Sequence, residues 1–113
     1  MFKELNSTRT IKEGIKLEDL QFRKLKDFVG KTLYVDGFFF TNGDYGKQLV
    51  VVARDNEGGW KVNMPNRAIV QFEGIKAEKD QLKAVLEGHL KIVDIREEKL
   101  GRGVTTLYTL DDC

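Results

Sequence analysis

Residues 31–64 read KTLYVDGFFFTNGDYGKQLVVVARDNEGGWKVNM, and this stretch decides the predicted fold. Aromatic and β-branched residues, which favour β-strands, gather in three runs at residues 32–41, 47–54 and 60–64. Glycine-rich segments separate the runs. Residues 42–46 predict a hairpin loop, and residues 56–59 predict a second turn. The stretch therefore predicts a meander of three antiparallel strands.

The periodicity changes after this meander. Asn63 and Pro65 suit the start of a helix, and apolar residues then recur at helical spacing as far as residue 87. Gly74 interrupts the pattern, so the segment predicts one helix or two short ones, with Gly88 at the end. Two further strands are predicted at residues 90–97 and 104–110, joined by a turn at residues 99–103.

Five strands with a helix between the third and the fourth follow the order of the OB-fold barrel, which binds oligonucleotides and oligosaccharides. Gly37 supports this fold, because the long first strand of a small barrel must bend, and a glycine or a bulge makes such a bend. The predicted class is mainly β (α+β): a five-stranded OB-fold barrel with a helix between strands 3 and 4 and an N-terminal helix. The alternative is a generic α+β domain with helices on one side of an antiparallel sheet.

The segment before residue 30 is predicted to lie outside the barrel. Residues 1–16 show no sustained period and predict a loose arm with at most one short strand. Residues 17–29 carry apolar residues close to helical spacing before Gly30, which predicts a helix. The 113 residues fit a single domain over residues 1–113, with the barrel at residues 30–112.

Composition excludes several classes of protein. The chain has 19 Lys and Arg against 18 Asp and Glu, which argues against binding nucleic acid by bulk charge but allows a focused basic groove. Cys113 is the one cysteine, which excludes an intrachain disulfide and favours a cytoplasmic setting. No apolar run approaches the ~20 residues that span a bilayer, so we expect no membrane partner.

Residue patterns for catalysis are sparse. His89 is the one histidine, without a cysteine near it in sequence, and Asp111 and Asp112 are adjacent on a strand, so their side chains point to opposite faces. The sequence has neither a glycine-rich phosphate-binding motif nor a nucleophile motif. We therefore expect a protein that is not an enzyme and that uses no metal and no cofactor.

The first predicted strand presents two different faces. The purely apolar set, expected in the barrel interior, is Leu33, Val35 and Phe39. The set expected to face outward is Tyr34, Asp36, Phe38 and Phe40. Bases stack on such aromatic rings at roughly 1–3 kcal/mol each. Two alternatives remain at this stage: Phe38 or Phe40 packs beneath the N-terminal helix, or a bulge at Gly37 shifts the facing of the residues after it.

The ligand groove of an OB-fold crosses strands two and three between two loops. Tyr45, between glycines in the first loop, is expected to stack on a base, whereas Trp60 either stacks or packs in the core. Arg102 lies in the last turn, where it either binds phosphate or is simply solvated. The complete set of predicted nucleic-acid-binding residues is Tyr34, Phe38, Phe40, Tyr45, Lys47, Arg54, Trp60, Lys61, Arg102 and Tyr108.

Several of these stretches resemble a known group of proteins. They are Gly30-Lys31, Phe38-Phe39-Phe40-Thr41, Tyr45-Gly46-Lys47-Gln48, Val50-Val51-Val52, Val62-Asn63-Met64-Pro65 and the closing Leu110-Asp111-Asp112. Together they resemble small OB-fold proteins encoded by phages and mobile elements of Gram-positive bacteria, over about residues 30–112. The resemblance is one of layout and implies single-stranded DNA binding or a role in DNA replication. Residues 1–113 do not include the long tail with an acidic tip found in bacterial housekeeping single-strand binders, so we do not expect partners to be recruited through such a tail.

The sequence therefore predicts binding of single-stranded nucleic acid, and of DNA in particular, by base stacking and phosphate contacts. Help from a homo-oligomer is expected, since an edge strand left open can pair with another chain. The alternative is a protein-interaction or assembly module in which the outward aromatics form a subunit interface. A site for an oligosaccharide or another small ligand would use the same residue types.

Overall fold

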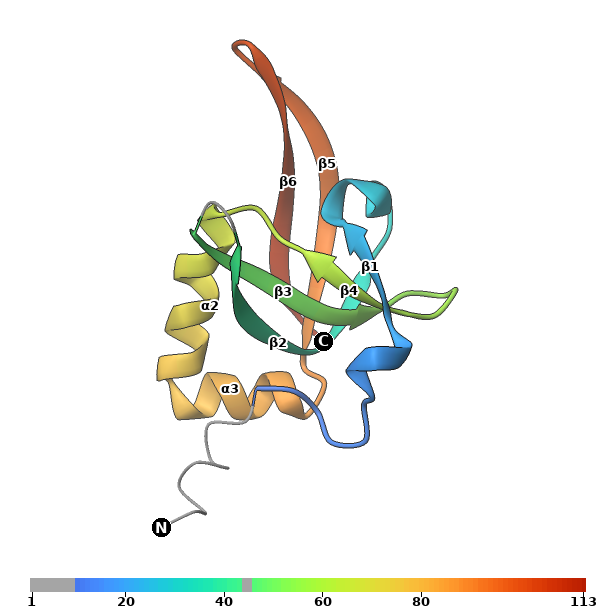
Figure 1. Cartoon of the computed structure of the whole chain (residues 1–113), viewed down its shortest axis with the longest axis vertical. Helices are drawn as coiled ribbons and strands as arrows, with labels where there is room; N and C mark the ends of the chain where they lie inside the picture. Colours follow the sequence, from blue (N-terminus) through green and yellow to red (C-terminus); the bar gives the residue numbers. More distant parts are fainter. Residues whose placement is uncertain (1–9, 44–45) are drawn as a thin grey trace.

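The computed structural model describes residues 10–43 and 46–113. They form a curled sheet of six strands in the order β1-β4-β3-β2-β5-β6, with two helices packed on it (Figure 1). The strands are β1 (Gln21–Lys24), β2 (Leu33–Gly43), β3 (Gly46–Arg54), β4 (Gly59–Asn63), β5 (Leu90–Leu100) and β6 (Gly103–Asp112). The helices are α2 (Arg67–Ala77) and α3 (Lys79–Leu86), and two 3-10 turns are η1 (Leu17–Asp19) and η2 (Leu25–Phe28).

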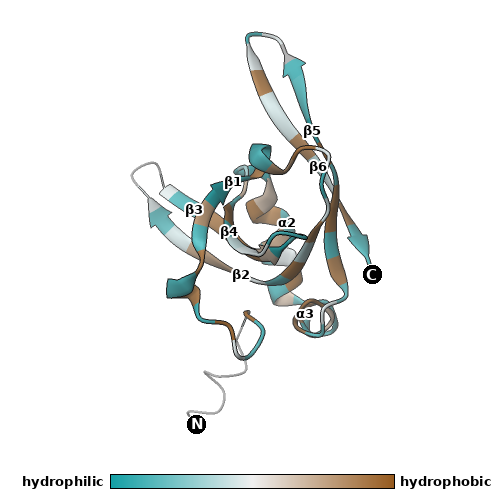
Figure 2. Cartoon of the chain, turned by 90° about the vertical axis from the view of Figure 1, so that its right-hand side faces the viewer, coloured by the Kyte–Doolittle hydropathy of each residue, from teal (hydrophilic) through white to brown (hydrophobic). Residues whose placement is uncertain are grey.

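The predicted mainly β class is confirmed, and the elements after residue 30 lie where their periodicity places them. β2, β3 and β4 form the predicted antiparallel meander, and α2 and α3 are the two short helices that follow it. β5 and β6 form a long hairpin whose far end, around the turn, extends beyond the body of the molecule in both views (Figures 1 and 2). Within the described residues, no helix is long and apolar enough to cross a membrane.

The helix predicted over residues 17–29 is not formed. Two 3-10 turns instead flank β1, which pairs in parallel with β4. Leu25 and Phe28 of η2 are buried in the core, whereas all of β1 is exposed. The near-helical spacing of apolar residues thus arises from an extended segment followed by η2, whose Leu25 and Phe28 enter the core, whereas η1 before it buries no residue. Since β1 and β6 are the two ends of the sheet, it is open between them.

A bulge in β2 reverses part of the predicted facing. Val35 pairs with Ala53 and Gly37 pairs with Val52, which leaves Asp36 as an extra residue. An extra residue moves every later side chain to the other face of the strand. Phe38 is therefore 0% exposed and Phe40 packs against the core, so the prediction that both face outward is wrong.

Phe39, predicted in the interior, instead pairs with Val50 on the outer face of the sheet. The alternative of a bulge at Gly37 was the correct one.

The main core lies between the sheet and the two helices. Phe38 of β2 meets Phe72 of α2 edge to face, with ring centroids 5.1 Å apart. The core cluster consists of Leu25, Phe28, Leu33, Val35, Phe38, Leu49, Val51, Ala53, Val62, Met64, Ala68, Phe72, Leu82, Val85, Ile92 and Ile95. The register of β2 therefore decides which large ring fills the space beneath α2.

Residues 10–20, which we call the strap, dock on the bulge of β2. The Phe38 amide donates to the Thr10 carbonyl over 2.8 Å, and the Lys12 amide donates to the Asp36 carbonyl over 2.7 Å. A glycine is needed at position 37 because a Cβ atom there would lie 2.4 Å from the Ile11 Cα. The short strand predicted within the N-terminal arm corresponds to this pairing, an isolated bridge between Ile11 and Gly37.

The strap then passes over the outer face of β3. Val50 and Val52 face outward from this strand, and each is only 1% exposed although neither belongs to the main core cluster. Ile15 and Leu20 of the strap line a cavity of about 430 Å³ together with Val52. The outer face of β3, where a ligand groove was predicted, is therefore apolar and covered near Val52.

Paired substitutions test the register of β2. Phe38→Ala is expected to lower the free energy of unfolding by about 3–5 kcal/mol, because it removes a buried ring from the core. Phe39→Ala is the matched control and should lower it by well under half as much, since this ring is only partly buried. Urea denaturation measures both values. Equal losses would contradict the bulge.

Candidate functional site

The predicted nucleic-acid-binding residues do not gather in one groove. Tyr45 lies outside the described residues, and Phe38 is enclosed in the core. Phe40 and Lys47 lie against α2, where the Lys47 Nζ is 4.4 Å from the Phe40 ring centroid and 2.9 Å from the Glu73 Oε1. The charge of Lys47 is thus compensated within the fold, and Phe40 is shared with the core.

Tyr34 and Arg54 form a second, separate pair on β2 and β3. The Arg54 guanidinium lies 5.7 Å from the Tyr34 ring centroid, and its Nε is 3.2 Å from the Asp36 Oδ2. Asp36 is only 7% exposed, so Arg54 mainly neutralises a buried carboxylate. The neighbouring Lys31 lies 3.8 Å and 3.7 Å from two more carboxylates, those of Asp55 and Glu57. With three carboxylates against two cations, this part of the surface does not favour a polyanion.

Trp60 packs rather than presenting a stacking surface. Its ring lies against Phe28, with centroids 6.4 Å apart, and its indole N–H donates to the Asp55 Oδ1 over 3.1 Å. Burial raises the pKa of Asp55, but the hydrogen bond from Trp60, two backbone N–H groups and the charge of Lys31 lower it by more. The net pKa of Asp55 therefore lies below its ordinary value.

The last two predicted residues, Arg102 and Tyr108, belong to the β5–β6 hairpin. The Tyr108 hydroxyl donates to Gln71 of α2, and the Arg67 guanidinium lies 5.5 Å from its ring. Arg67 also donates to the Thr105 hydroxyl over 3.2 Å. Tyr108 therefore anchors the hairpin to α2, whereas Arg102 is exposed in the turn at the hairpin tip.

Lys61 lies next to a group of residues that were not predicted as site residues from the sequence. β1 pairs with β4 so that Phe22 stands beside Lys61, whose Nζ is 4.4 Å from the Phe22 ring centroid. Phe22 is 55% exposed. A surface hollow of about 400 Å³ next to this pair is lined by Phe22, Arg23, Lys24, Lys26, Asp27 and Asn63. We call these residues together with Lys61 the β1–β4 surface.

The β1–β4 surface is strongly basic within a chain of balanced charge. It holds four cations, Arg23, Lys24, Lys26 and Lys61, against one carboxylate, that of Asp27. Arg23 covers the Trp60 ring, with its Cζ 4.6 Å from the centroid. The three lysines form no ion pair within the part of the chain that the structure describes. Their charge is therefore available to an anionic ligand.

The β1–β4 surface was not predicted, because residues 17–29 were expected to form a helix. In a helix, Arg23, Lys24 and Lys26 are an ordinary solvated side, and Phe22 belongs to the apolar stripe. The extended backbone of β1 instead turns Phe22 outward and places it against Lys61. The sequence did contain a signal for this surface. Three of the five residues in the run Phe22-Arg23-Lys24-Leu25-Lys26 are basic.

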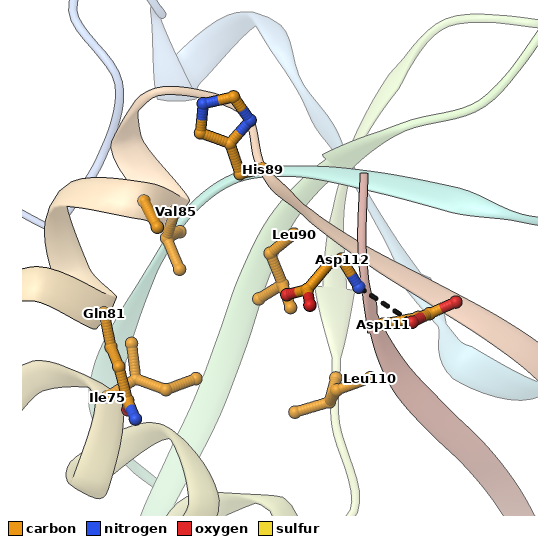
Figure 3. Close-up of a pocket in the computed structure, with 9 residues that line it drawn as sticks. Ile75, Gln81, Val85, His89, Leu90, Leu110, Asp111 and Asp112 are labelled. Carbon is orange, nitrogen blue, oxygen red and sulfur yellow. Dashed lines mark hydrogen bonds between the residues drawn. The ribbon is translucent and has the colours of Figure 1, made fainter.

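A second hollow, of about 290 Å³, lies between α3 and the ends of β5 and β6 (Figure 3). Its walls include the apolar side chains of Ile75, Val85 and Leu90, and Asp111 and Asp112 lie at its edge. The His89 Nδ1 is 3.1 Å from the Cys113 carbonyl oxygen. Across the described ranges, no three His, Cys, Asp or Glu residues are grouped so that they could hold a metal ion.

Comparison with known proteins adds no assignment to these sites. No family model, no curated protein and no solved structure matches the chain. The candidate site therefore rests on its own geometry and charge.

The lowered pKa of Asp55 predicts a pH-dependent contribution to stability. Asp55→Ala should lower the free energy of unfolding near neutral pH. The difference from wild type should shrink as the pH falls through the lowered pKa, because below it the folded state no longer keeps the carboxylate charged. Urea denaturation from about pH 7 to about pH 2 measures this. A difference between Asp55→Ala and wild type that stays constant with pH would contradict this prediction.

Proposed function

We propose that this protein binds single-stranded nucleic acid on the β1–β4 surface, without catalysing a reaction. The observation that carries the proposal is an exposed aromatic ring, Phe22, which lies beside Lys61 and lines a hollow together with Arg23, Lys24 and Lys26. Bases stack on such rings with little regard to sequence, and lysine and arginine side chains bind the phosphates that link them. The β1–β4 surface therefore offers a ring for the base and cations for the phosphate within one small area.

The charge of this surface favours a polyanion over a protein partner. The cores of protein interfaces are depleted in charged residues, because desolvating them is costly. Lys61 lies on the Phe22 ring, and Lys24 and Lys26 line the hollow beside it, so an apolar partner covering this surface would desolvate their charges. Phosphate oxygens compensate this charge directly. The assembly module remains the second candidate, distinguished by a stable oligomer that binds no nucleic acid.

The order of the strands and helices along the chain also supports this proposal. β2 to β6, with α2 and α3 between β4 and β5, follow the chain order of the OB-fold. In that order β3 and β4 are the second and third barrel strands, and β1 extends the sheet beside β4. The proposed site thus lies at the edge of the usual OB-fold binding face. The resemblance to small phage-encoded proteins favours DNA, with a role in replication.

Binding is tested by fluorescence anisotropy with a labelled oligo-dT of about 12 nucleotides. The proposal predicts saturable binding at low salt to the full chain. A lack of saturable binding at protein concentrations up to ~10⁻⁴ M, where weak nonspecific complexes form, would contradict it.

Two substitutions locate the site. Phe22→Ala should weaken binding by about 1–3 kcal/mol, or roughly fivefold to 150-fold, through the loss of stacking. Lys61→Ala should weaken it through the loss of a cation next to the ring. Val70→Ala and Lys79→Ala are the matched controls, since both residues are exposed on the helices, outside the β1–β4 surface, and they should leave affinity unchanged. If the controls weaken binding as much, the site lies elsewhere.

The dependence of the binding affinity on salt concentration gives the number of phosphates that the protein contacts. Four cations predict that a plot of log affinity against log salt concentration falls with a slope no steeper than about −3, at about −0.7 for each phosphate neutralised on a single strand. The same anisotropy titration at several salt concentrations measures it, and Lys24→Ala should make the slope shallower. A slope near zero would show that phosphates are not bound.

A further inference from the structure

Asp27 stands out on the β1–β4 surface, because a carboxylate next to bound phosphates repels them. Its Oδ2 accepts the Lys24 backbone N–H over 3.3 Å. Its Oδ1 accepts no hydrogen bond from the residues that the structure describes. Asp27 lines the same hollow as the exposed Phe22 ring, so a base stacked on that ring would present its edge toward a carboxylate with acceptor capacity to spare.

The four bases differ in what they offer to a carboxylate. The Watson–Crick edge of guanine carries two adjacent donors, N1–H and the exocyclic N2 amino group, which match the two oxygens of a carboxylate. Adenine and cytosine each offer one amino donor beside a ring acceptor, and thymine offers one N–H flanked by two carbonyl acceptors. An acceptor placed opposite a carboxylate is repelled, so only guanine meets it with two favourable contacts.

We propose that Asp27 makes the β1–β4 surface prefer guanine at the base stacked on Phe22. This inference rests on the proposed function and specifies the ligand at that same site. Asn63, which lines the same hollow and is exposed, supplies an amide that donates to the guanine O6 carbonyl. Asp27 thus weakens phosphate binding for every sequence, and its hydrogen bonds to guanine offset this repulsion only when the stacked base is guanine.

The test compares three labelled oligonucleotides of about 12 nucleotides with the full chain by anisotropy. The first is oligo-dT, the second has one central thymine replaced by guanine, and the third has inosine there, which keeps N1–H but lacks the N2 amino group. The guanine oligonucleotide should bind at least about fivefold more tightly than oligo-dT, and inosine should lose most of that gain. Equal affinities for all three would overturn the inference, whereas no binding to any would overturn the proposed function instead.

Asp27→Asn then separates recognition from simple repulsion. Asparagine can still accept the Lys24 N–H, so the local fold is preserved. It cannot accept two hydrogen bonds from guanine with a pair of carboxylate oxygens. We expect the preference for guanine over thymine to fall at least about threefold while the affinity for oligo-dT stays the same or rises. Asp19→Asn removes an equal charge from η1 and should keep the preference. Equal changes for all three oligonucleotides on Asp27→Asn would show repulsion alone and contradict a reading role.

Discussion

The extra residue at Asp36 is the constraint on which the arrangement of this protein depends. It turns Phe38 inward onto Phe72 and so fills the space between β2 and α2. It also places Gly37 where the backbone of the strap can approach the strand. The strap fastened there ends with η1 and continues directly into β1, so the bulge fixes the start of the segment that brings Phe22 to the side of Lys61.

The molecule separates its charges although their total is nearly balanced. Around Tyr34 and Arg54, carboxylates outnumber cations, and the cations there are engaged in ion pairs. The β1–β4 surface, by contrast, holds four cations against one carboxylate, and one of these cations, Lys61, lies on the exposed Phe22 ring. A net charge of +1 therefore does not describe either region, because the field that a ligand meets depends on the groups within about 10 Å of it. On the β1–β4 surface, a largely exposed ring lies beside a lysine that forms no ion pair with the residues the structure describes.

The sequence was informative where the signals are local. Alternation, helical spacing and turn glycines placed β2 to β6 and both helices, because each of these elements is set by residues close in sequence. The parallel pairing of β1 with β4 could not be read, since it joins residues 21–24 to residues 60–63 and β1 buries none of its own side chains. The facing of Phe38 was left open for a related reason: Gly37 allows a bend with or without an extra residue, and the packing of Phe38 on Phe72 decides between them.

Most candidate site residues were of the right chemical type but in the wrong surroundings. Lys47, Arg54 and Trp60 each found an acidic partner within the fold, which sequence alone does not reveal because the partners are brought together by packing. Lys61 differs from these three residues, because it lies next to an exposed ring and among other cations.

Backbone chemical-shift mapping tests directly whether nucleic acid binds where β1 joins β4. The ¹⁵N-labelled full chain would be titrated with an unlabelled oligonucleotide. Binding there should give the largest shifts at residues 21–27 and 61–63, with small shifts at the hairpin tip and along α2. Largest shifts at the hairpin tip around Arg102, or beside Tyr34 and Arg54, would contradict it.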